Sequence, residues 1–141
     1  MVNIRPFKSL DDLDKPFIIQ KEQEWEYDLE TIGNWLKTPI NAFLFENDSE
    51  ILAQMFLIQL GADRCAVCMH ISQNAGKQAR ELIRKGLRLL DFYSFGRYEA
   101  YVRQGFEQGQ RLVELCGFQL EGLMRNFEGG KDYYMYSKVR V

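Results

Sequence analysis

The chain has 141 residues, of which 46% are hydrophobic and 27% charged, and its formal net charge is −2. These values predict one globular domain over residues 1–141 and exclude a disordered chain. They also argue against a nucleic-acid-binding protein and against a membrane protein, because no run approaches the ~20 apolar residues of a transmembrane helix.

Two stretches of the chain carry opposite charge. Residues 11–50 hold eleven acidic and three basic side chains, and residues 76–111 hold eight basic and four acidic ones. Such asymmetry can steer a cationic acceptor to one side and a polyanion to the other. For the acidic stretch, an ordinary solvated face is the better interpretation.

The cysteines and the single histidine indicate neither disulfides nor metal. Cys65, Cys68 and Cys116 do not form a disulfide framework, and a zinc site needs about four nitrogen or sulfur ligands. We expect reduced, buried cysteines in a cytoplasmic protein without a metal ion.

The first 39 residues predict a strand followed by helices. Met1–Pro6 is the expected strand, and Ser9 is a helix N-cap followed by acidic residues. A second helix is expected over Lys21–Lys37 and ends before Pro39. Its apolar stripe consists of Trp25, Leu29, Ile32 and Leu36.

The middle of the chain predicts a three-stranded meander that leads into a helix. The strands are Ile40–Glu46, Glu50–Leu60 and Cys65–Ser72, separated by polar turns. A cationic amphipathic helix is expected over Gly76–Leu90. A strand that passes through a glycine turn into a helix directs backbone N–H groups and the positive end of the helix dipole at one place, which favours phosphate.

The remaining residues predict a strand, a short helix and two further strands. These are Arg97–Arg103, Gly105–Cys116, Phe118–Phe127 and Tyr133–Val139, with Gly117 ending the helix. The complete order is β-α-α-β-β-β-α-β-α-β-β. It indicates an α+β fold with one mixed sheet and helices on its faces.

This order and four short motifs resemble the GNAT fold of the Gcn5-related N-acetyltransferases. The motifs are Ile4-Arg5-Pro6 with Asp11-Asp12, the strand–turn–helix over 65–90, Leu112 with Gly117-Phe118 and Glu121-Gly122, and Asp132-Tyr133-Tyr134-Met135-Tyr136-Ser137. The resemblance covers essentially the whole chain.

The resemblance implies an acyltransferase that uses acetyl-CoA and an amine acceptor. Pantetheine would pair with the fourth strand, whose N–H groups near Met69–Ile71 would stabilise an oxyanion. The CoA phosphates would lie at the turn and the start of the helix. The implied cofactor-binding residues are Met69, Ile71, Gln73, Gly76, Lys77, Gln78 and Ala79. No catalytic residue is identified.

Three positions depart from the family pattern. Gln73 and Gly76 match the pyrophosphate motif Q/R-x-x-G-x-G/A, but Gln78 occupies the second small position. Phe106 and Val113 stand where many members have Asn and Tyr. Valine cannot replace a tyrosine that protonates the leaving thiolate, although acetyl transfer mainly needs two well-positioned reactants.

Other polar residues have a functional and a structural interpretation. His70 could be a general base, but a lone histidine in an apolar strand is more often a hydrogen-bonded core residue. Glu24, Glu26 and Glu46 could bind a cationic acceptor, but we expect them to face solvent. Tyr133, Tyr134 and Tyr136 could line an acceptor groove, although strand aromatics mostly reflect packing.

Two functions therefore remain open. The first is an N-acyltransferase that transfers acetyl from acetyl-CoA to an amine in the cytoplasm. The alternative is a catalytically silent GNAT-fold structural or binding protein with a protein partner, such as a bacteriophage virion-associated protein of the host cytoplasm or virion. The opening Ile4–Ser9 resembles that of the internal virion protein of short-tailed bacteriophages. Oligomeric state is not predicted.

Overall fold

The structure is a computed structural model that describes residues 1–140, except for the side chain of Trp25. Val141 and the predicted inward packing of Trp25 lie outside the described residues. The strands are β1 (Asn3–Pro6), β2 (Asn41–Glu46), β3 (Ile51–Gly61), β4 (Arg64–Ile71), β5 (Arg97–Arg103), β6 (Gln119–Glu128) and β7 (Lys131–Val139). The helices are α1 (Leu29–Leu36), α2 (Ala79–Tyr93) and α3 (Glu107–Leu115), with short 3-10 helices η1 (Leu10–Asp12), η2 (Lys21–Glu26) and η3 (Gly76–Gln78).

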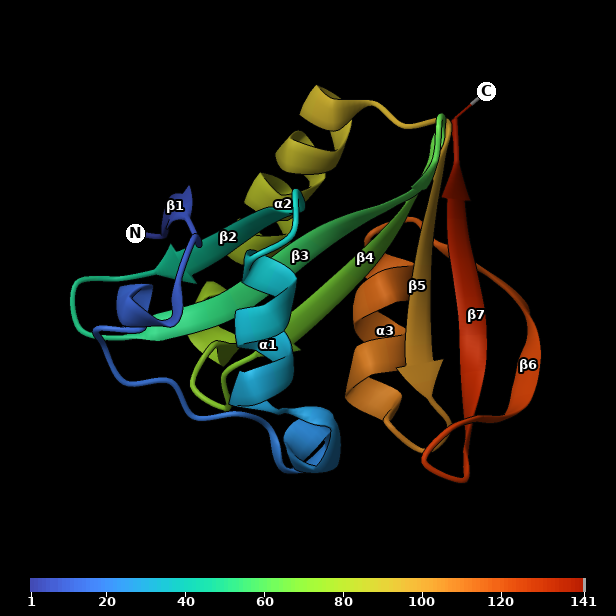
Figure 1. The fold of residues 1–141 in the computed structure, drawn as a ribbon, viewed down its shortest axis with the longest axis horizontal. Helices are drawn as coiled ribbons and strands as arrows, with labels where there is room; N and C mark the ends of the chain where they lie inside the picture. The colour runs from blue at the N-terminus through green and yellow to red at the C-terminus, as the bar shows by residue number, and fades with distance from the viewer. Residues whose placement is uncertain (141) are drawn as a thin grey trace. The chain divides into compact units, whose positions relative to one another are not determined.

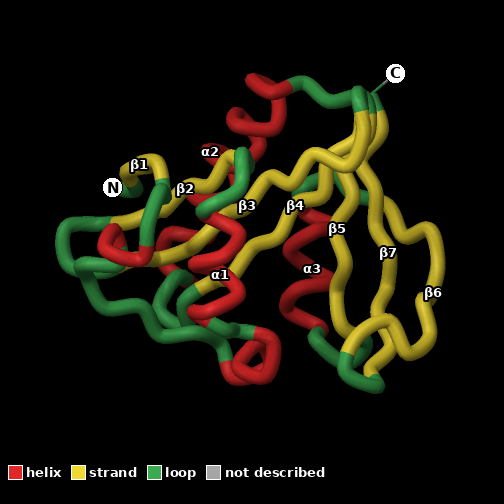
Figure 2. The backbone as a smooth tube through the Cα atoms, viewed as in Figure 1, coloured by secondary structure: helices red, strands yellow, loops and turns green. Residues whose placement is uncertain are grey.

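The strands form one mixed sheet in the order β1-β2-β3-β4-β5-β7-β6. The strand order along the chain and the three main helices agree with the predicted element order, and Figure 2 shows where they lie along the backbone. β4 and β5 pair in parallel, whereas β5–β7 and β6–β7 are antiparallel. The predicted α+β fold with a mixed sheet is confirmed.

The chain divides into two compact units. The first consists of residues 1–58 and 68–85, and the second of residues 59–67 and 86–141. In the first unit, α1 lies over the strands β2 and β3 (Figure 1). The buried cluster beneath it consists of Phe7, Ile32, Ala42, Leu44, Ile51 and Phe56. Burial of these apolar side chains is the main stabilising contribution in this unit.

The predicted single helix over Lys21–Lys37 is wrong. The segment forms the 3-10 helix η2 and the separate helix α1, with the extended residue Tyr27 between them. The break occurs because Asp28 is an N-cap: its carboxylate accepts the Glu30 N–H at 3.2 Å and the Thr31 hydroxyl at 2.6 Å. A capping carboxylate satisfies helix N–H groups that a continuous helix would bond internally.

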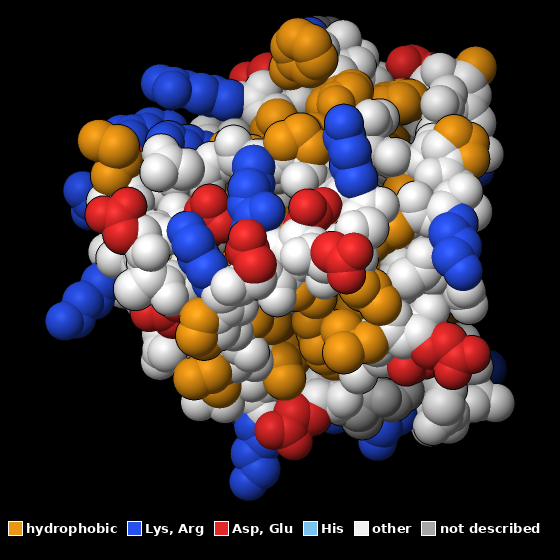
Figure 3. Space-filling model, turned by 60° about the vertical axis from the view of Figure 1, so that its left-hand side comes forward, with side chains coloured by type: hydrophobic (Ala, Val, Ile, Leu, Met, Phe, Trp, Pro, Cys, Tyr) orange, Lys and Arg blue, Asp and Glu red, His pale blue; other side chains and the backbone are white. Residues whose placement is uncertain are grey.

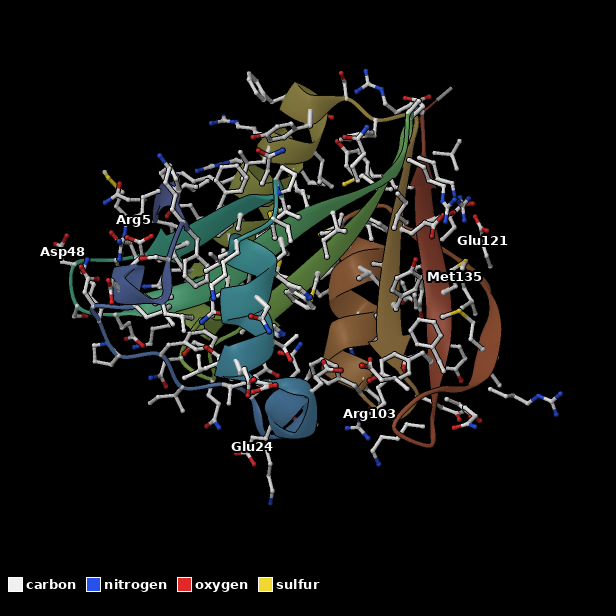
Figure 4. The ribbon with its side chains drawn as sticks, viewed as in Figure 1. Arg5, Glu24, Asp48, Arg103, Glu121 and Met135 are labelled. Carbon is white, nitrogen blue, oxygen red and sulfur yellow. The ribbon has the colours of Figure 1, made fainter. Side chains whose placement is uncertain are left out.

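The N-terminal motif has a structural role in the first unit. Arg5 donates from Nε to the Glu46 carboxylate at 2.9 Å and from Nη2 to Asp14 at 2.7 Å and to the Asp12 carbonyl at 2.7 Å. Ser9 and Asp12 form a capping box that starts η1, as predicted for Ser9. The guanidinium therefore ties β1 to β2 and to the segment that follows η1 (Figure 4).

A buried carboxylate organises the second unit. Glu99 on β5 is 2% exposed. Its Oε2 accepts hydrogen bonds from Arg64 Nε at 2.7 Å and Arg97 Nε at 2.8 Å, and its Oε1 accepts from the Tyr101 hydroxyl at 2.7 Å. Burial alone would raise the pKa of Glu99, but these hydrogen bonds lower it. Burial, followed by the hydrogen bond to Glu99, raises the pKa of Tyr101 to about 12.

Arg97 extends this hydrogen-bond network from Glu99 to β6. Arg97 donates from both terminal nitrogens to Glu121, at 2.8 and 2.9 Å, and the Ser137 hydroxyl also donates to this carboxylate. The hydrogen bonds from Arg97 and then Ser137 lower the pKa of Glu121 to about 2. Figure 4 shows Glu121 and Met135 on β6 and β7. Arg97 therefore connects β5 to both strands of the β6–β7 hairpin, because it also contacts the Met135 sulfur at 3.7 Å.

The surface mixes acidic and basic side chains. Figure 3 shows Lys and Arg interspersed with Asp and Glu over the face that it presents. In the acidic stretch, Glu46 is paired locally: it contacts Arg5 at 2.9 Å and Lys15 at 3.4 Å. Among residues 1–140, no helix combines the length and the apolar character that a membrane span requires.

We predict that Glu99→Gln lowers the free energy of unfolding by about 2 kcal/mol, because it removes a buried charged acceptor of three hydrogen bonds. Urea denaturation measures the change. Glu107→Gln is the control, since Glu107 is 77% exposed and its ion pair with Arg111 contributes little. Equal effects of the two substitutions would contradict a structural role for Glu99.

Candidate functional site

The turn after β4 is held by hydrogen bonds within its own chain. The Ser72 hydroxyl accepts the Asn74 N–H at 3.1 Å, and the Ser72 carbonyl accepts the Ala75 N–H at 3.2 Å. The Gln78 N–H then donates to the Ala75 carbonyl at 3.0 Å. These contacts direct the chain from β4 into η3 and onward into α2, which confirms the predicted strand–turn–helix.

Gly76 and Lys77 lie at the start of this helical segment and are exposed. The first N–H groups of a helix have no intrahelical acceptor and carry the positive end of its dipole. A Cβ placed on Gly76 would meet no other heavy atom within 4 Å, so the space beside the glycine is open. Arg80 and Arg84 are exposed on α2. The segment thus combines N–H donors, positive charge and room for a phosphate.

Two further residues of the predicted phosphate motif, Gln78 and Ala79, are half-buried at the junction of η3 and α2. The Gln78 backbone is already hydrogen-bonded within the turn. The position at which the family motif has a small residue therefore holds a long polar side chain in this chain.

Gln73, the first residue of the predicted phosphate motif, is bonded to the N-terminal segment. Its backbone N–H donates to the Ile18 carbonyl at 2.8 Å, and its Nε2 donates to the Ile19 carbonyl at 3.0 Å. Ile19 also forms an isolated antiparallel bridge with Ser72. In this structure the Gln73 amides therefore hold residues 18–19 against the end of β4.

The predicted pantetheine-binding edge of β4 is bonded to Gln23. The Ser72 N–H donates to the Leu52 carbonyl of β3 at 2.8 Å. Because successive residues of a strand direct their N–H groups to alternate sides, the Ile71 N–H faces the opposite edge. There it donates to Gln23 Oε1 at 3.3 Å, and Gln23 Nε2 donates to the Met69 carbonyl at 3.0 Å. Gln23 is 6% exposed, so its carboxamide is buried on this edge.

The ladder between β4 and β5 is short. It pairs Arg64–Ala66 with Arg97–Glu99, whereas β4 continues to Ile71. β5 pairs with β7 over its whole length, Arg97–Arg103. The end of β4 therefore uses a side chain, and not a neighbouring strand, as its hydrogen-bonding partner on this edge.

His70 is a core residue, as favoured from the sequence. It is 3% exposed, and its ring centroid lies 5.1 Å from that of Tyr27 and 5.7 Å from that of Phe56. The expected hydrogen bonding is only partly present: Nε2 lies 4.0 Å from Cys68 Sγ, and within residues 1–140 no hydrogen-bond partner reaches Nδ1. Burial lowers the pKa of His70 to about 4. The imidazole is therefore neutral at pH 7 and a poor general base.

Another buried polar residue, Gln54, was not identified from the sequence. It is fully buried on β3 and donates from Nε2 to the Tyr27 hydroxyl at 2.7 Å, while burial raises the pKa of this hydroxyl. The sequence could have identified Gln54 because it is the one polar residue in the apolar run Ile51–Leu57. Gln23 gave no comparable signal, because it lies among the acidic residues of an expected surface helix.

The three acidic residues considered for binding a cationic acceptor differ in how exposed their side chains are. Glu24 is exposed, as expected, and points away from η2 (Figure 4). Glu46 does not face solvent freely: its side chain is 14% exposed and pairs with Arg5 and Lys15. Glu26 is half-buried, which also differs from the expected solvent-facing position. Glu46 is therefore a structural residue and not an available base.

Phe106 and Val113 contribute apolar packing where many GNAT members have polar groups. Phe106 is 8% exposed and precedes α3. A Cβ on Gly109 would approach the Phe106 ring to 2.6 Å, so the ring lies directly against the helix backbone. Val113 is half-buried on α3. Neither side chain can donate a proton to a leaving group.

Tyr133 and Tyr136 are 3% and 1% exposed, so both are packing residues, whereas Tyr134 is half-buried.

Cys65, Cys68 and Cys116 form no disulfide, and burial raises the pKa of the Cys116 thiol. In the part of the chain that the structure describes, no group of three or more His, Cys, Asp or Glu side chains is placed to hold a metal ion.

No protein-family model and no curated protein sequence matches the chain significantly. Its structure, however, is similar to many solved N-acetyltransferases. The Escherichia coli ribosomal-protein-S18-alanine N-acetyltransferase has a TM-score of 0.78 at 16% identity, over 99% of this chain and 94% of that one. An N-acetyltransferase from Staphylococcus aureus has a TM-score of 0.74 at 13% identity, over 99% and 97%.

A third similar structure is the spermidine/spermine N-acetyltransferase of Vibrio cholerae, with a TM-score of 0.70 at 16% identity, over 98% of this chain and 92% of that one. Such low identities establish the fold and leave the activity open. The chain therefore has the GNAT fold that its motifs predicted.

We predict that His70 stays uncharged down to about pH 4 in the folded protein. Since folding lowers its pKa from 6.5, the unfolded chain binds more protons between pH 6.5 and 4, and the free energy of unfolding falls by about 3 kcal/mol as the pH decreases through this window. The measurement is urea denaturation as a function of pH, together with NMR of the single histidine.

His70→Phe is the matched variant, because phenylalanine keeps an aromatic ring beside Tyr27 and Phe56 and does not titrate. The variant should lose the additional pH dependence between pH 6.5 and 4. An imidazole that titrates near pH 6.5 in the folded protein would contradict this assignment.

Proposed function

We propose that the protein is an N-acyltransferase that transfers an acetyl group from acetyl-CoA to an amine. The observation that carries the proposal is the open, cationic start of the helix after β4, at Gly76 and Lys77, in a chain with the fold of N-acetyltransferases. A diphosphate fits this position because N–H donors, lysine and arginine charge and free space coincide there.

The residues present also fit an amide-bearing arm. On one edge of β4, the Met69 carbonyl is an acceptor and the Ile71 N–H is a donor, and a carboxamide already bonds to both. Pantetheine contains two amides, so the same pair of groups can hold it. Met69, Ile71, Gln73, Gly76, Lys77, Gln78 and Ala79 are therefore the residues proposed to bind the cofactor.

Bound acetyl-CoA would supply a thioester carbonyl, which the acceptor amine attacks to form an amide and release the CoA thiol. The contribution of this chain is positioning of the phosphates and the arm. His70 is too weak a base and Glu46 is paired with Arg5 and Lys15, so neither is proposed to take the proton of the acceptor amine.

A second candidate function is a catalytically silent binding protein with a protein partner, which includes the bacteriophage virion-associated protein suggested by the opening motif. Specific observations favour it: Gln23 occupies the β4 edge, and Phe106 and Val113 are packing residues. An acceptor panel separates the two functions. It contains spermidine and an alanine-terminated peptide, the acceptors in the names of the similar enzymes.

We predict that Gly76→Leu weakens acetyl-CoA binding at least tenfold without unfolding the protein. A side chain has room there in the free protein, but it would fill the space that the phosphates need. Isothermal titration calorimetry measures the affinity, and thermal denaturation checks the fold.

Gly122→Leu is the matched control, because a Cβ on this β6 glycine also meets no atom within 4 Å. Its affinity for acetyl-CoA should equal that of the wild type. If Gly76→Leu binds acetyl-CoA as tightly as the wild type, the phosphates do not lie at this turn. If the wild type binds no acetyl-CoA, the binding-protein alternative is favoured.

A further inference from the structure

The Gln23 carboxamide makes two hydrogen bonds to backbone groups that are two residues apart on one edge of β4. It donates to the Met69 carbonyl at 3.0 Å and accepts from the Ile71 N–H at 3.3 Å. A primary carboxamide offers an N–H donor and a carbonyl acceptor on the same side, and two successive amides of an extended chain can offer the same pair. The edge is therefore complementary to an amide, and the side chain demonstrates the fit.

Gln23 is held there by the segment that precedes it. The Ile18 and Ile19 carbonyls accept from the Gln73 N–H at 2.8 Å and from Gln73 Nε2 at 3.0 Å, and Ile19 bridges to Ser72. Residues 18–23 thus follow the end of β4 as a short strap. The strap reaches from the predicted phosphate turn to the Met69–Ile71 edge.

The strap is partly exposed and is attached to β4 through the hydrogen bonds named above. Ile18 is 49% exposed, and η2 is a six-residue 3-10 helix whose N-cap, Gln20, makes no side-chain capping bond. Short 3-10 helices have poorer hydrogen-bond geometry than α-helices. The Gln23 carboxamide can therefore leave the edge at a small energetic cost, provided that another amide replaces it.

We propose that Gln23 is an intramolecular occupant of the Met69–Ile71 edge of β4, which an amide-bearing ligand chain must displace. This inference rests on the proposed function in one respect: the ligand chain is the pantetheine arm of acetyl-CoA. Gln23 is then a competitor of the cofactor, and the observed affinity is the intrinsic affinity multiplied by the fraction of molecules in which the edge is open.

The test compares the affinities of wild type, Gln23→Ala and Gln20→Ala for two ligands by isothermal titration calorimetry. Acetyl-CoA carries phosphates and the amide arm, whereas ADP carries a diphosphate without the arm. Gln23→Ala should bind acetyl-CoA about tenfold more tightly than the wild type and ADP equally well. Gln20→Ala, the matched control at the N-cap of the same 3-10 helix, should leave both affinities unchanged.

A second variant, Gln23→Glu, keeps the test informative if Gln23→Ala does not fold properly. Gln23→Glu keeps the length of the side chain and can still accept from the Ile71 N–H, but its carboxylate repels the Met69 carbonyl. It should tighten acetyl-CoA binding by an intermediate factor. Amide hydrogen exchange of Ile71 gives a readout without turnover: exchange should accelerate in free Gln23→Ala and slow again when acetyl-CoA is added.

The outcomes separate this inference from the proposed function. Equal or weaker acetyl-CoA binding by Gln23→Ala, with a wild type that binds, overturns the role of Gln23 and leaves the acyltransferase proposal intact. Equal tightening for ADP also overturns it, because the gain then does not involve the amide arm. Failure of every variant to bind acetyl-CoA overturns the proposed function and, with it, the displacement by pantetheine.

Discussion

On the side that faces β5, β4 pairs with a strand only over Arg64–Ala66, and the rest of this edge needs other hydrogen-bond partners. Buried backbone N–H and C=O groups need hydrogen-bond partners, and β3 supplies them on one side of the strand only. The ladder with β5 ends at Ala66. Beyond this residue the partners come from the chain between β1 and α1, through Gln23 and the Ile18–Ile19 carbonyls. The position of this segment is thus determined by the hydrogen-bonding needs of β4.

This arrangement connects the fold to the candidate function. The groups that hold the segment are those that a GNAT acyltransferase would offer to its cofactor, so folding and binding use the same donors and acceptors. The departure at Gln78 is then less decisive than the sequence suggested, because the space beside Gly76 in the predicted phosphate turn is open. The edge occupied by Gln23 is the more informative departure, since it involves both predicted contacts of the pantetheine arm.

The titratable groups with the most shifted pKa values have structural explanations. The pKa of Glu121 is lowered by Arg97 and Ser137 within the β5–β6–β7 part of the sheet, and that of His70 is lowered by burial between two aromatic rings. Shifted pKa values often mark catalytic residues, but ion-pair networks and buried cores produce them too. Here they describe how each unit is held together, and catalysis would depend on positioning.

Local periodicity and turn chemistry were enough to predict the order of the strands and main helices, the turn at Ser72–Gly76 and the N-cap at Ser9. The sequence by itself did not predict the break at Tyr27–Asp28, since the apolar spacing continues through a residue whose carboxylate prefers to cap a new helix. Nor could it predict Gln23 on β4 or the pairing of Glu46 with Arg5. Gln23 and Met69 are separated by 46 positions in the sequence, and Arg5 and Glu46 by 41. Such distant residues come into contact only when the chain folds.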